Sequence, residues 1–321
     1  MSMHHTFSQH LANTTMAGAI AAARKSGFGN KNSADLAATE AMRAYLDQMP
    51  AQTTIVIGEG ERDEAPMLYI GEKIGQGQTK IDVAVDPLEN TNATANLNNR
   101  AISVLAASEA GGLFHAPDMY MNKLIVGPEA AEHVDLDYSV EKNIQGLAKG
   151  LERDIEDLVI VVLDRDRHED LVAEIRRVGA RVKLISDGDL LPGIAAAMRG
   201  TGIHAVMGIG AAPEGVITAA ALRCIKGKMQ ARFWPKNDEE KQRLKKMGGK
   251  LDKVYTHEEL ASGHTIIFAA TGVTNGDVLR GVRFFGHGAR THTLLMDNQT
   301  NQIRFIDTTH VFDKEQIKYR L

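Results

Sequence analysis

Short apolar runs recur along the chain between polar loops, and each run has the length of a buried strand. Such runs lie at residues 54–57, 81–85, 101–106, 158–163, 182–185, 205–209, 266–270, 292–296 and 302–307. A further strand is predicted within residues 115–124, which lead from a loop into a strand. Because helical patterns separate several of these runs, the chain is predicted to be a mixed α/β protein.

Two helices are predicted before the first strand. Residues 8–24 are rich in alanine, and the helix that follows places apolar side chains on one face at helical spacing. Asn32 or Ser33 is the expected N-cap of this second helix. Asp35 would then lie in its first turn, where the helix dipole favours an acid. Residues 67–74 are predicted to form a short helix or a helical turn.

From residue 158 onward, predicted strands and helices alternate. The helices are expected over residues 167–178, 190–198 and 213–225, with a charged surface helix over 236–250. This βαβ rhythm predicts a mostly parallel sheet, and ligands of such sheets bind beyond the carboxyl ends of the strands. Three of these ends carry distinctive loops, which are charged at residues 164–168 and 187–189 and rich in glycine and alanine at residues 208–215.

Length and composition narrow the class of protein. A chain of 321 residues exceeds what one core usually organises, so two domains are predicted, 1–157 and 158–321. The net charge is −4 and no basic face or tail stands out in the sequence, so nucleic acid is not an expected partner. The single cysteine, Cys224, excludes an internal disulfide and a cysteine-based zinc site. We find no secretory signal and no apolar run of about 20 residues, so a cytoplasmic protein without a membrane span is expected.

The segment that follows the predicted strand 81–85 carries the most informative chemistry. Proline at position 87 keeps Asp86 extended at the strand end. Glu89 and Thr91 follow closely, so the turn presents two carboxylates and a hydroxyl in a small space. Oxygen-rich clusters of this kind suit magnesium or manganese better than zinc. The alternative is an ordinary capped turn, because Asp-Pro often starts turns and threonine often caps helices.

Two other acidic positions suggest the same chemistry. Glu59 stands between Gly58 and Gly60 at the end of the strand 54–57, and more acids follow up to residue 64. Glycines on both sides indicate tight backbone geometry around one carboxylate. Glu214, next to a proline, fits the first turn of a helix, where it favours the dipole, and it fits a metal ligand equally well.

Several other catalytic patterns are missing from the sequence. The glycine-rich segment after the strand 205–209 lacks the third glycine of a dinucleotide fold, and no Walker pattern occurs. No Gly-x-Ser-x-Gly elbow is found, and Cys224 lies in an apolar helical setting. Nucleophilic catalysis by serine or cysteine therefore has little support.

The longest motifs resemble one family. The segments IVIGEGERDEAPMLYIGEKIG, DVAVDPLENT, APDMYMNKLIVG, DRDRH, SDGD and GAAPEG are similar, in this order, to those of the class II fructose-1,6-bisphosphatases of the lithium-sensitive sugar-phosphatase superfamily. The resemblance implies a layered α/β/α/β/α fold, with two mixed sheets sandwiched by helices. It also implies a gluconeogenic enzyme of carbohydrate and glycerol metabolism that hydrolyses the 1-phosphate of fructose 1,6-bisphosphate. Two or more Mn²⁺ or Mg²⁺ ions and a homodimer or homotetramer are implied as well.

The resemblance also assigns roles to residues of this chain. The implied metal ligands are Asp35, Glu59, Asp86, Glu89 and Glu214, and the implied catalytic residues are Lys31, Asp63 and Thr91. The implied substrate-binding positions are Glu89, Asn90, Thr91, Tyr120, Arg165, Asp166, Arg167, Asp187, Gly188, Asp189 and Ala211.

This chain departs from the family pattern at three substrate positions. Asn90 and Ala211 replace glycines, and Asp166 replaces a common proline. Asparagine tolerates the left-handed conformation that glycine would adopt, so the turn at residue 90 is expected to survive.

Alternative functions are hydrolysis of sedoheptulose 1,7-bisphosphate, alone or as a dual activity, hydrolysis of an inositol or nucleotide monophosphate, and a sensor that binds sugar phosphates without hydrolysing them.

Overall fold

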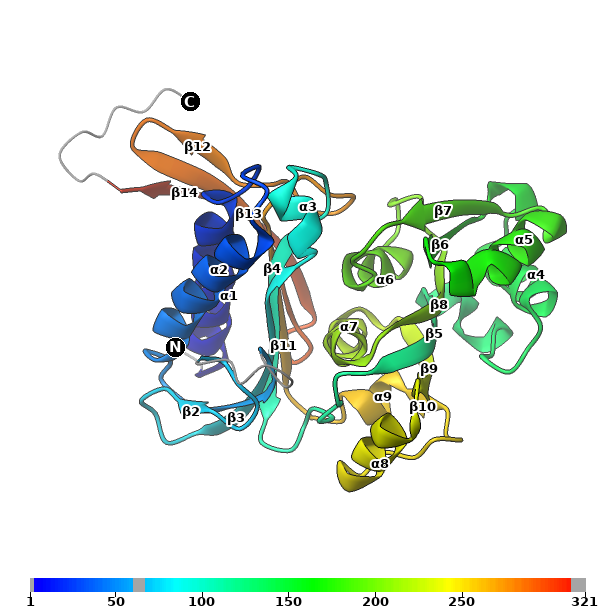
Figure 1. Ribbon diagram of the computed structural model, residues 1–321, viewed down its shortest axis with the longest axis horizontal. Helices are drawn as coiled ribbons and strands as arrows, with labels where there is room; N and C mark the ends of the chain where they lie inside the picture. The colour runs from blue at the N-terminus through cyan, green and yellow to red at the C-terminus, as the bar shows by residue number, and fades with distance from the viewer. Residues whose placement is uncertain (1–2, 60–66, 313–321) are drawn as a thin grey trace.

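The computed structural model describes residues 3–59 and 67–312, and within them five layers of helix and sheet alternate (Figure 1). Helices α1 (Met3–Ala23) and α2 (Lys31–Leu46) cover the outer face of the first sheet. Helices α6 (Leu190–Ala196) and α7 (Ala212–Ile225) lie between the two sheets, and α4 (Val140–Leu151) and α5 (Glu169–Val178) cover the outer face of the second sheet. The predicted layered α/β/α/β/α fold is confirmed.

The first sheet has eight strands in the order β12-β13-β11-β4-β3-β1-β2, with β14 also paired to β13. Its strands are β1 (Gln52–Ile57), β2 (Lys73–Ile74), β3 (Lys80–Glu89), β4 (Ile102–Glu109), β11 (Ile266–Gly272), β12 (Arg283–Phe285), β13 (Gly288–Asp297) and β14 (Gln302–Val311). Most pairings are antiparallel, and only β1 and β3 run parallel within the described residues.

The second sheet has six strands in the order β10-β9-β5-β8-β6-β7. Its strands are β5 (Tyr120–Val126), β6 (Val159–Leu163), β7 (Arg181–Ile185), β8 (Ala205–Ala211), β9 (Lys228–Trp234) and β10 (Tyr255–Thr256). Strand β6 is parallel to β7 and β8, whereas β5 is antiparallel to β8 and β9. The expectation of a mostly parallel sheet was therefore wrong, because the βαβ rhythm describes only β6, β7 and β8.

The two sheets do not divide the chain at the predicted boundary between residues 157 and 158. Strand β5 precedes that boundary and belongs to the second sheet, whereas β11 to β14 follow it and return to the first sheet. Figure 1 shows this return in the orange and red strands beside the blue helices. The chain enters the second sheet from the first and then completes the first, so the layers are interlocked in sequence.

Each interface between layers has its own apolar core. Met42 and Leu105 are buried between the first sheet and the α1 and α2 helices. Phe268 and Val216 belong to the cluster between the two sheets, and Ile144 belongs to the one between the second sheet and its outer helices. Both sheets are thus covered on two faces, which explains why their strands read as continuous apolar runs.

Several local expectations need correction. Asn30, rather than Asn32 or Ser33, caps α2, because its Oδ1 accepts a hydrogen bond of 3.0 Å from the backbone N–H of Ser33. The first turn of α2 then contains no acid, so the helix dipole does not account for Asp35. Residues 67–74 form a turn and β2 rather than a helix.

Three further helices and three 3₁₀ segments are present among the described residues. They are α3 (Thr91–Ala95), α8 (Asp238–Lys246), α9 (His257–Leu260) and the 3₁₀ segments Pro128–His133, Ile155–Asp157 and Asp166–His168. Helix α4 and strand β9 were not predicted from the sequence. Across the described part of the chain, no helix combines the length and apolar character needed to cross a bilayer.

Candidate active site

A pocket of about 320 Å³ opens where β3, β6, β7 and β8 end. Its lining residues are Asp86, Leu88, Glu89, Asn90, Thr91, Asn92, Tyr120, Leu163, Arg165, Arg167, Asp187, Gly188, Asp189, Gly210, Ala211 and Glu214. The pocket lies at strand ends, where ligands of layered α/β proteins bind. Both sheets contribute to it, so the site depends on the whole fold.

The wall from the first sheet is shaped by an irregularity in β3. The strand continues through Pro87 to Glu89 instead of ending at Asp86, and its register against β4 shifts between Asp86 and Glu89. Such a bulge redirects side chains, and here both carboxylates line the pocket. Asn90 follows with φ 69°, in the left-handed region, and its Oδ1 accepts a hydrogen bond of 3.2 Å from Ala93 N–H. This departure from glycine is thus compatible with the turn.

The charges of the five predicted metal ligands act on one another's pKa values. Burial raises the pKa of Asp86 well above its ordinary value, and the charges of the other four acids raise it further. The pKa of Glu89 rises to about 8, and those of Glu59 and Glu214 rise to about 7, in each case mainly because of burial. Burial also raises the pKa of Asp35 to about 6. The acids therefore form one cluster of mutually repelling carboxylates.

Two oxygens of this cluster have no partner among the described residues. Glu89 Oε2 and Glu214 Oε2 are buried without a hydrogen bond. A buried carboxylate oxygen without a partner is costly, and a hard divalent cation would satisfy it. Within residues 3–59 and 67–312, no group of three carboxylate, imidazole or thiol side chains is arranged to hold a metal ion, so the ligand roles of these acids stay a prediction. The residues match magnesium or manganese in donor type and charge, with water or phosphate needed to complete the coordination.

Two arginines, Arg165 and Arg167, line the same pocket. Arg165 Nη2 lies 2.5 Å from Asp187 Oδ1. Arg167 donates from Nη2 to Ile209 O at 2.9 Å, and its guanidinium lies 4.7 Å from the centre of the Tyr120 ring. Arg167 Nε is buried and has no partner among the described groups. Arg167 Nε is therefore a donor that an anion in the pocket could use.

His168 fixes the loop that carries these arginines. Its Nδ1 lies 2.7 Å from Leu163 O, and its Nε2 accepts a hydrogen bond of 2.7 Å from Ile209 N–H. The first contact is a donation, so the imidazole is neutral, which agrees with a pKa lowered mainly by burial. The ring joins the end of β6 to β8 and holds Arg167 against the pocket. Sequence reasoning missed this role, because a histidine in a polar loop gave no sign of burial.

The structure places the predicted site residues unevenly. Every predicted substrate position lines the pocket except Asp166, which lines a neighbouring hollow with Asp164 and Glu169. The replacement of proline by Asp166 therefore adds no charge to the pocket lining, although the resemblance assigns this position to substrate binding. Lys31 is exposed at the start of α2 and does not line the pocket, and Asp63 lies outside the described residues.

A second group was also missed, namely Lys123 in the middle of β5. It is 1% exposed, and its Nζ lies 2.5 Å from Asp189 Oδ2. The available signal was a lysine directly before the apolar run Leu124–Val126. A lysine inside a buried strand needs a counter-ion, which indicates a functional or structural pair.

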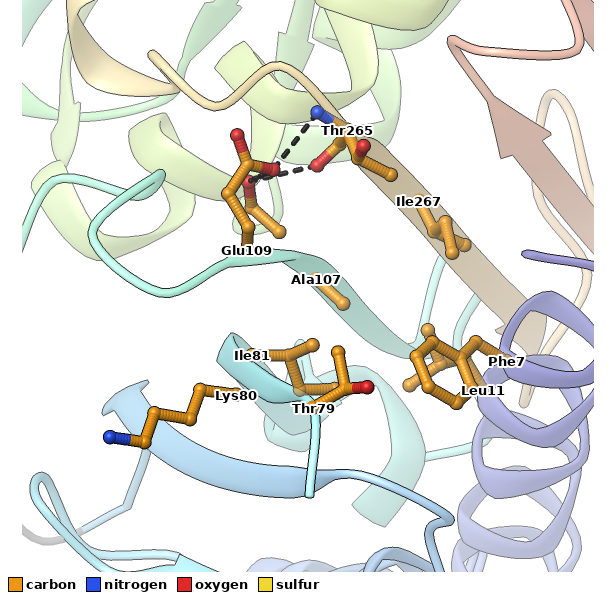
Figure 2. A pocket seen from close by; sticks show the side chains of 10 residues that line it. Phe7, Leu11, Thr79, Lys80, Ile81, Ala107, Glu109, Thr265 and Ile267 are labelled. Atoms are coloured by element: carbon orange, nitrogen blue, oxygen red, sulfur yellow. Dashed lines mark hydrogen bonds between the residues drawn. The ribbon is translucent and has the colours of Figure 1, made fainter. Parts of the chain in front are cut away.

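A separate hollow of about 200 Å³ lies between α1 and the first sheet (Figure 2). Phe7, Leu11 and Ile267 line it, and Figure 2 shows Glu109 at its rim accepting a hydrogen bond of 2.9 Å from Thr265 N–H. None of the five converging acids lines this hollow. Three of them, Asp86, Glu89 and Glu214, line the first pocket, whereas Asp35 and Glu59 line neither.

Comparison with known proteins identifies a family that the sequence matches and relatives to which it is similar. The sequence matches the family described as bacterial fructose-1,6-bisphosphatase, glpX-encoded, over residues 5–310. A protein of Synechococcus sp. (strain JA-3-3Ab) is 52% identical over 324 residues, covering 93% of each chain. One from Microcystis aeruginosa is 47% identical over 338 residues, covering 97% of this chain and 98% of the relative. Both relatives are named D-fructose 1,6-bisphosphatase class 2/sedoheptulose 1,7-bisphosphatase.

Proposed function

Because the chain belongs to the family of bacterial, glpX-encoded fructose-1,6-bisphosphatases, we propose that it hydrolyses the 1-phosphate of fructose 1,6-bisphosphate. The products are fructose 6-phosphate and inorganic phosphate, so the enzyme is a phosphoric monoester hydrolase. Water adds to phosphorus, the bond between phosphorus and the sugar oxygen breaks, and that oxygen takes up a proton.

One observation carries this proposal, namely the polarity of the pocket. Asp86, Glu89 and Glu214 line it together with Arg165 and Arg167. A substrate with a phosphate at each end of a short sugar matches this arrangement. The reacting phosphate lies toward the acids, through bound cations, and the other phosphate lies toward the arginines, which suit it as bidentate donors.

The cations are Mg²⁺ or Mn²⁺, with two or more in each site. Asp35 and Glu59 would hold one ion, and Asp86, Glu89 and Glu214 would hold another. When bound, such ions neutralise phosphate oxygens and make a bound water more acidic. The partnerless oxygens of Glu89 and Glu214 support this assignment.

Residues of the chain perform the remaining tasks. Thr91 orients the attacking water, a role in which the family resemblance joins it with Asp63, and the resemblance assigns Lys31 to the charge of the reacting phosphate. Asp187 and Asp189 accept hydrogen bonds from sugar hydroxyls. No phosphoenzyme is formed, because the water attacks phosphorus directly.

Sedoheptulose 1,7-bisphosphate is the second candidate substrate. The relatives' names join this activity to the first one, and both substrates place a phosphate at each end of a sugar. The polarity of the pocket suits either sugar, so the proposal includes a dual activity. An inositol or nucleotide monophosphate would leave the arginine end without a phosphate, and so it fits less well.

The test is phosphate release by the purified protein with Mn²⁺. The two bisphosphates are compared with fructose 1-phosphate and with an inositol monophosphate. We expect turnover of at least one bisphosphate, with a higher kcat/KM than for either monophosphate. A protein that binds fructose 1,6-bisphosphate in calorimetry but releases no phosphate would be a sensor, and the proposed hydrolase function would be wrong.

The proposal extends to the setting of the reaction. We expect a cytoplasmic enzyme of gluconeogenesis and glycerol metabolism that acts as a homodimer or homotetramer. Exposed apolar side chains on β14, Ile303 at 46% and Phe305 at 48%, are the kind of surface that a second copy would cover. Light scattering coupled to size-exclusion chromatography measures the assembly.

A further inference from the structure

Lys123 is a charged side chain in the interior of the second sheet. It lies in the middle of β5, it is 1% exposed, and it is among the largest fully buried side chains of the described residues. Burying an ammonium group is costly unless it is paired and hydrogen-bonded. Its position therefore calls for an explanation in terms of its partners.

Both partners of Lys123 line the pocket. The ammonium lies 2.5 Å from Asp189 Oδ2, and it donates a hydrogen bond of 3.1 Å to the backbone carbonyl of Ala211. Asp189 is itself only 7% exposed. It precedes α6, whereas Ala211 ends β8. One ammonium thus joins β5 to two segments of the pocket wall.

The space for this pair depends on a glycine. A Cβ at Gly210 would clash with the carboxylate of Asp189 and would lie 2.8 Å from Lys123 Nζ. Gly210 also lines the pocket, directly before Ala211. The backbone therefore approaches the ion pair closely, and the pair forms part of the support of the pocket wall.

The charge of Lys123 also acts on two of the predicted metal ligands, Glu89 and Glu214. Burial raises the pKa values of Glu89 and Glu214, and Lys123 lowers both. Asp189 acts in the opposite direction on the same two groups. The ion pair is therefore close enough to Glu89 and Glu214 for its charges to act on both carboxylates.

We propose that Lys123 is a positioning residue, which fixes the carboxylate of Asp189 in the orientation that binds the sugar of the substrate. This inference rests on the proposed function, because it needs a sugar phosphate in the pocket. Lys123 acts through Asp189 and does not itself contact the substrate. Loss of such a supporting partner typically lowers affinity or activity by about 10–100-fold.

The experiment is a double-mutant cycle with Lys123→Met and Asp189→Asn. In the Lys123→Met variant we expect KM for fructose 1,6-bisphosphate to rise by about 10-fold or more, with a much smaller change in kcat. In the Asp189→Asn background the same change should have almost no further effect on KM, because the carboxylate that Lys123 orients is already absent. Effects on KM that simply multiply would overturn the proposal.

Mn²⁺ affinity distinguishes the positioning role from a general loss of the fold, because the two predict opposite changes in that affinity. Lys123→Met removes a positive charge near Glu89 and Glu214, so Mn²⁺ should bind the substrate-free variant as tightly as the wild type or more tightly. Titration calorimetry measures this affinity. Weaker Mn²⁺ binding together with a raised KM would indicate general damage and would refute the positioning role.

Lys228→Met is the matched control. Lys228 is a partly buried lysine in the neighbouring strand β9, and its ammonium donates to the carbonyls of Ala131 and Val134, away from the pocket. This variant should keep the wild-type KM. A tenfold rise in its KM as well would show that the effect at position 123 is not specific.

The double variant also covers the case in which Lys123→Met does not fold. Removing both charges leaves no buried carboxylate without its partner, so the double variant should be more stable than Lys123→Met alone. Its KM is then compared with that of Asp189→Asn. An inactive wild type would refute the proposed function, whereas an active wild type with a tenfold gap between these two variants would refute only the role of Lys123.

Discussion

Replacing Glu214 with glutamine should reduce the pH dependence of the stabilisation that divalent cations give this protein. Burial raises the pKa of Glu214 from 4.5 to about 7 in the folded, metal-free chain. The unfolded chain ionises near the ordinary value, so it releases its proton first as the pH rises. The metal-free protein therefore loses stability between these two pKa values, and this loss is complete above the higher one. A cation beside the carboxylate removes the penalty, so stabilisation by metal grows with pH.

The size of this effect follows from the pKa shift. Between about pH 5.5 and about pH 8, a group with these two pKa values contributes roughly 1.5 units of pKa difference, or about 2 kcal/mol. Unfolding entropy of roughly 2.1 cal/mol/K per residue gives about 0.7 kcal/mol/K for a chain of this length. Glu214 alone should thus change the metal-induced shift in Tm by about 3 °C across this interval.

Differential scanning fluorimetry of EDTA-treated protein, with and without Mn²⁺, measures this shift at each pH. The wild type is compared with Glu214→Gln, and with Glu156→Gln as a control at an exposed position on the outer side of the second sheet. We expect the control to keep the wild-type slope and Glu214→Gln to lose about 3 °C of it. The reasoning is refuted if Mn²⁺ stabilises the wild type equally at both pH values, or if Glu214→Gln keeps the full slope.

Three further predictions concern catalysis. Asp86→Ala should lower Mn²⁺-dependent phosphate release by about 1,000-fold, because several kcal/mol of charge stabilisation are lost, and a wild-type rate would contradict the metal site. Thr91→Ala should lower kcat by about 100-fold while calorimetric Mn²⁺ affinity is unchanged, and loss of that affinity instead would mean that Thr91 has another role. Arg165→Met should raise KM for fructose 1,6-bisphosphate by about 10–100-fold, since a charged hydrogen bond contributes about 1.5–3 kcal/mol. KM for fructose 1-phosphate should hardly change, and an equal rise for both substrates would argue against a contact with the second phosphate.

Much of the pocket was accessible from sequence because its residues follow apolar strands. Polar or charged residues follow β3, β6 and β7 directly, and Glu214 follows β8 by three positions. The ends of β6, β7 and β8 meet at one edge of the second sheet. The placing of polar loops at strand ends needs only the neighbouring residues, so a single sequence can support it. The expectation that the turn at Asn90 survives came instead from the family resemblance, which places a glycine there, and from the tolerance of asparagine for the left-handed region, and its φ of 69° agrees.

Other features depend on partners far away in the chain. In the sequence, Lys123 is a single charged residue within a predicted strand. Its counter-ion, Asp189, comes from the loop between β7 and α6. The return of β11 to β14 to the first sheet depends on pairing with β4, which no local pattern contains. Asp166 illustrates a third limit, because a 3₁₀ turn begins at this residue and only the arginines on either side of it line the pocket. Sequence spacing does not determine which side chain of such a turn faces inward.

The pocket contains groups that the protein itself does not satisfy, and this bears on substrate choice. Glu89 Oε2 and Glu214 Oε2 lack hydrogen-bond partners among the described residues, and so does Arg167 Nε. An unsatisfied buried group costs about 1–3 kcal/mol, which corresponds to a factor of about 5–150 in binding. A cation-bound phosphate near the acids and a second phosphate near the arginine would satisfy these groups. A monophosphate would leave the guanidinium unsatisfied, so the proposed preference for a bisphosphate would arise from these unpartnered groups as well as from the contacts that a ligand makes.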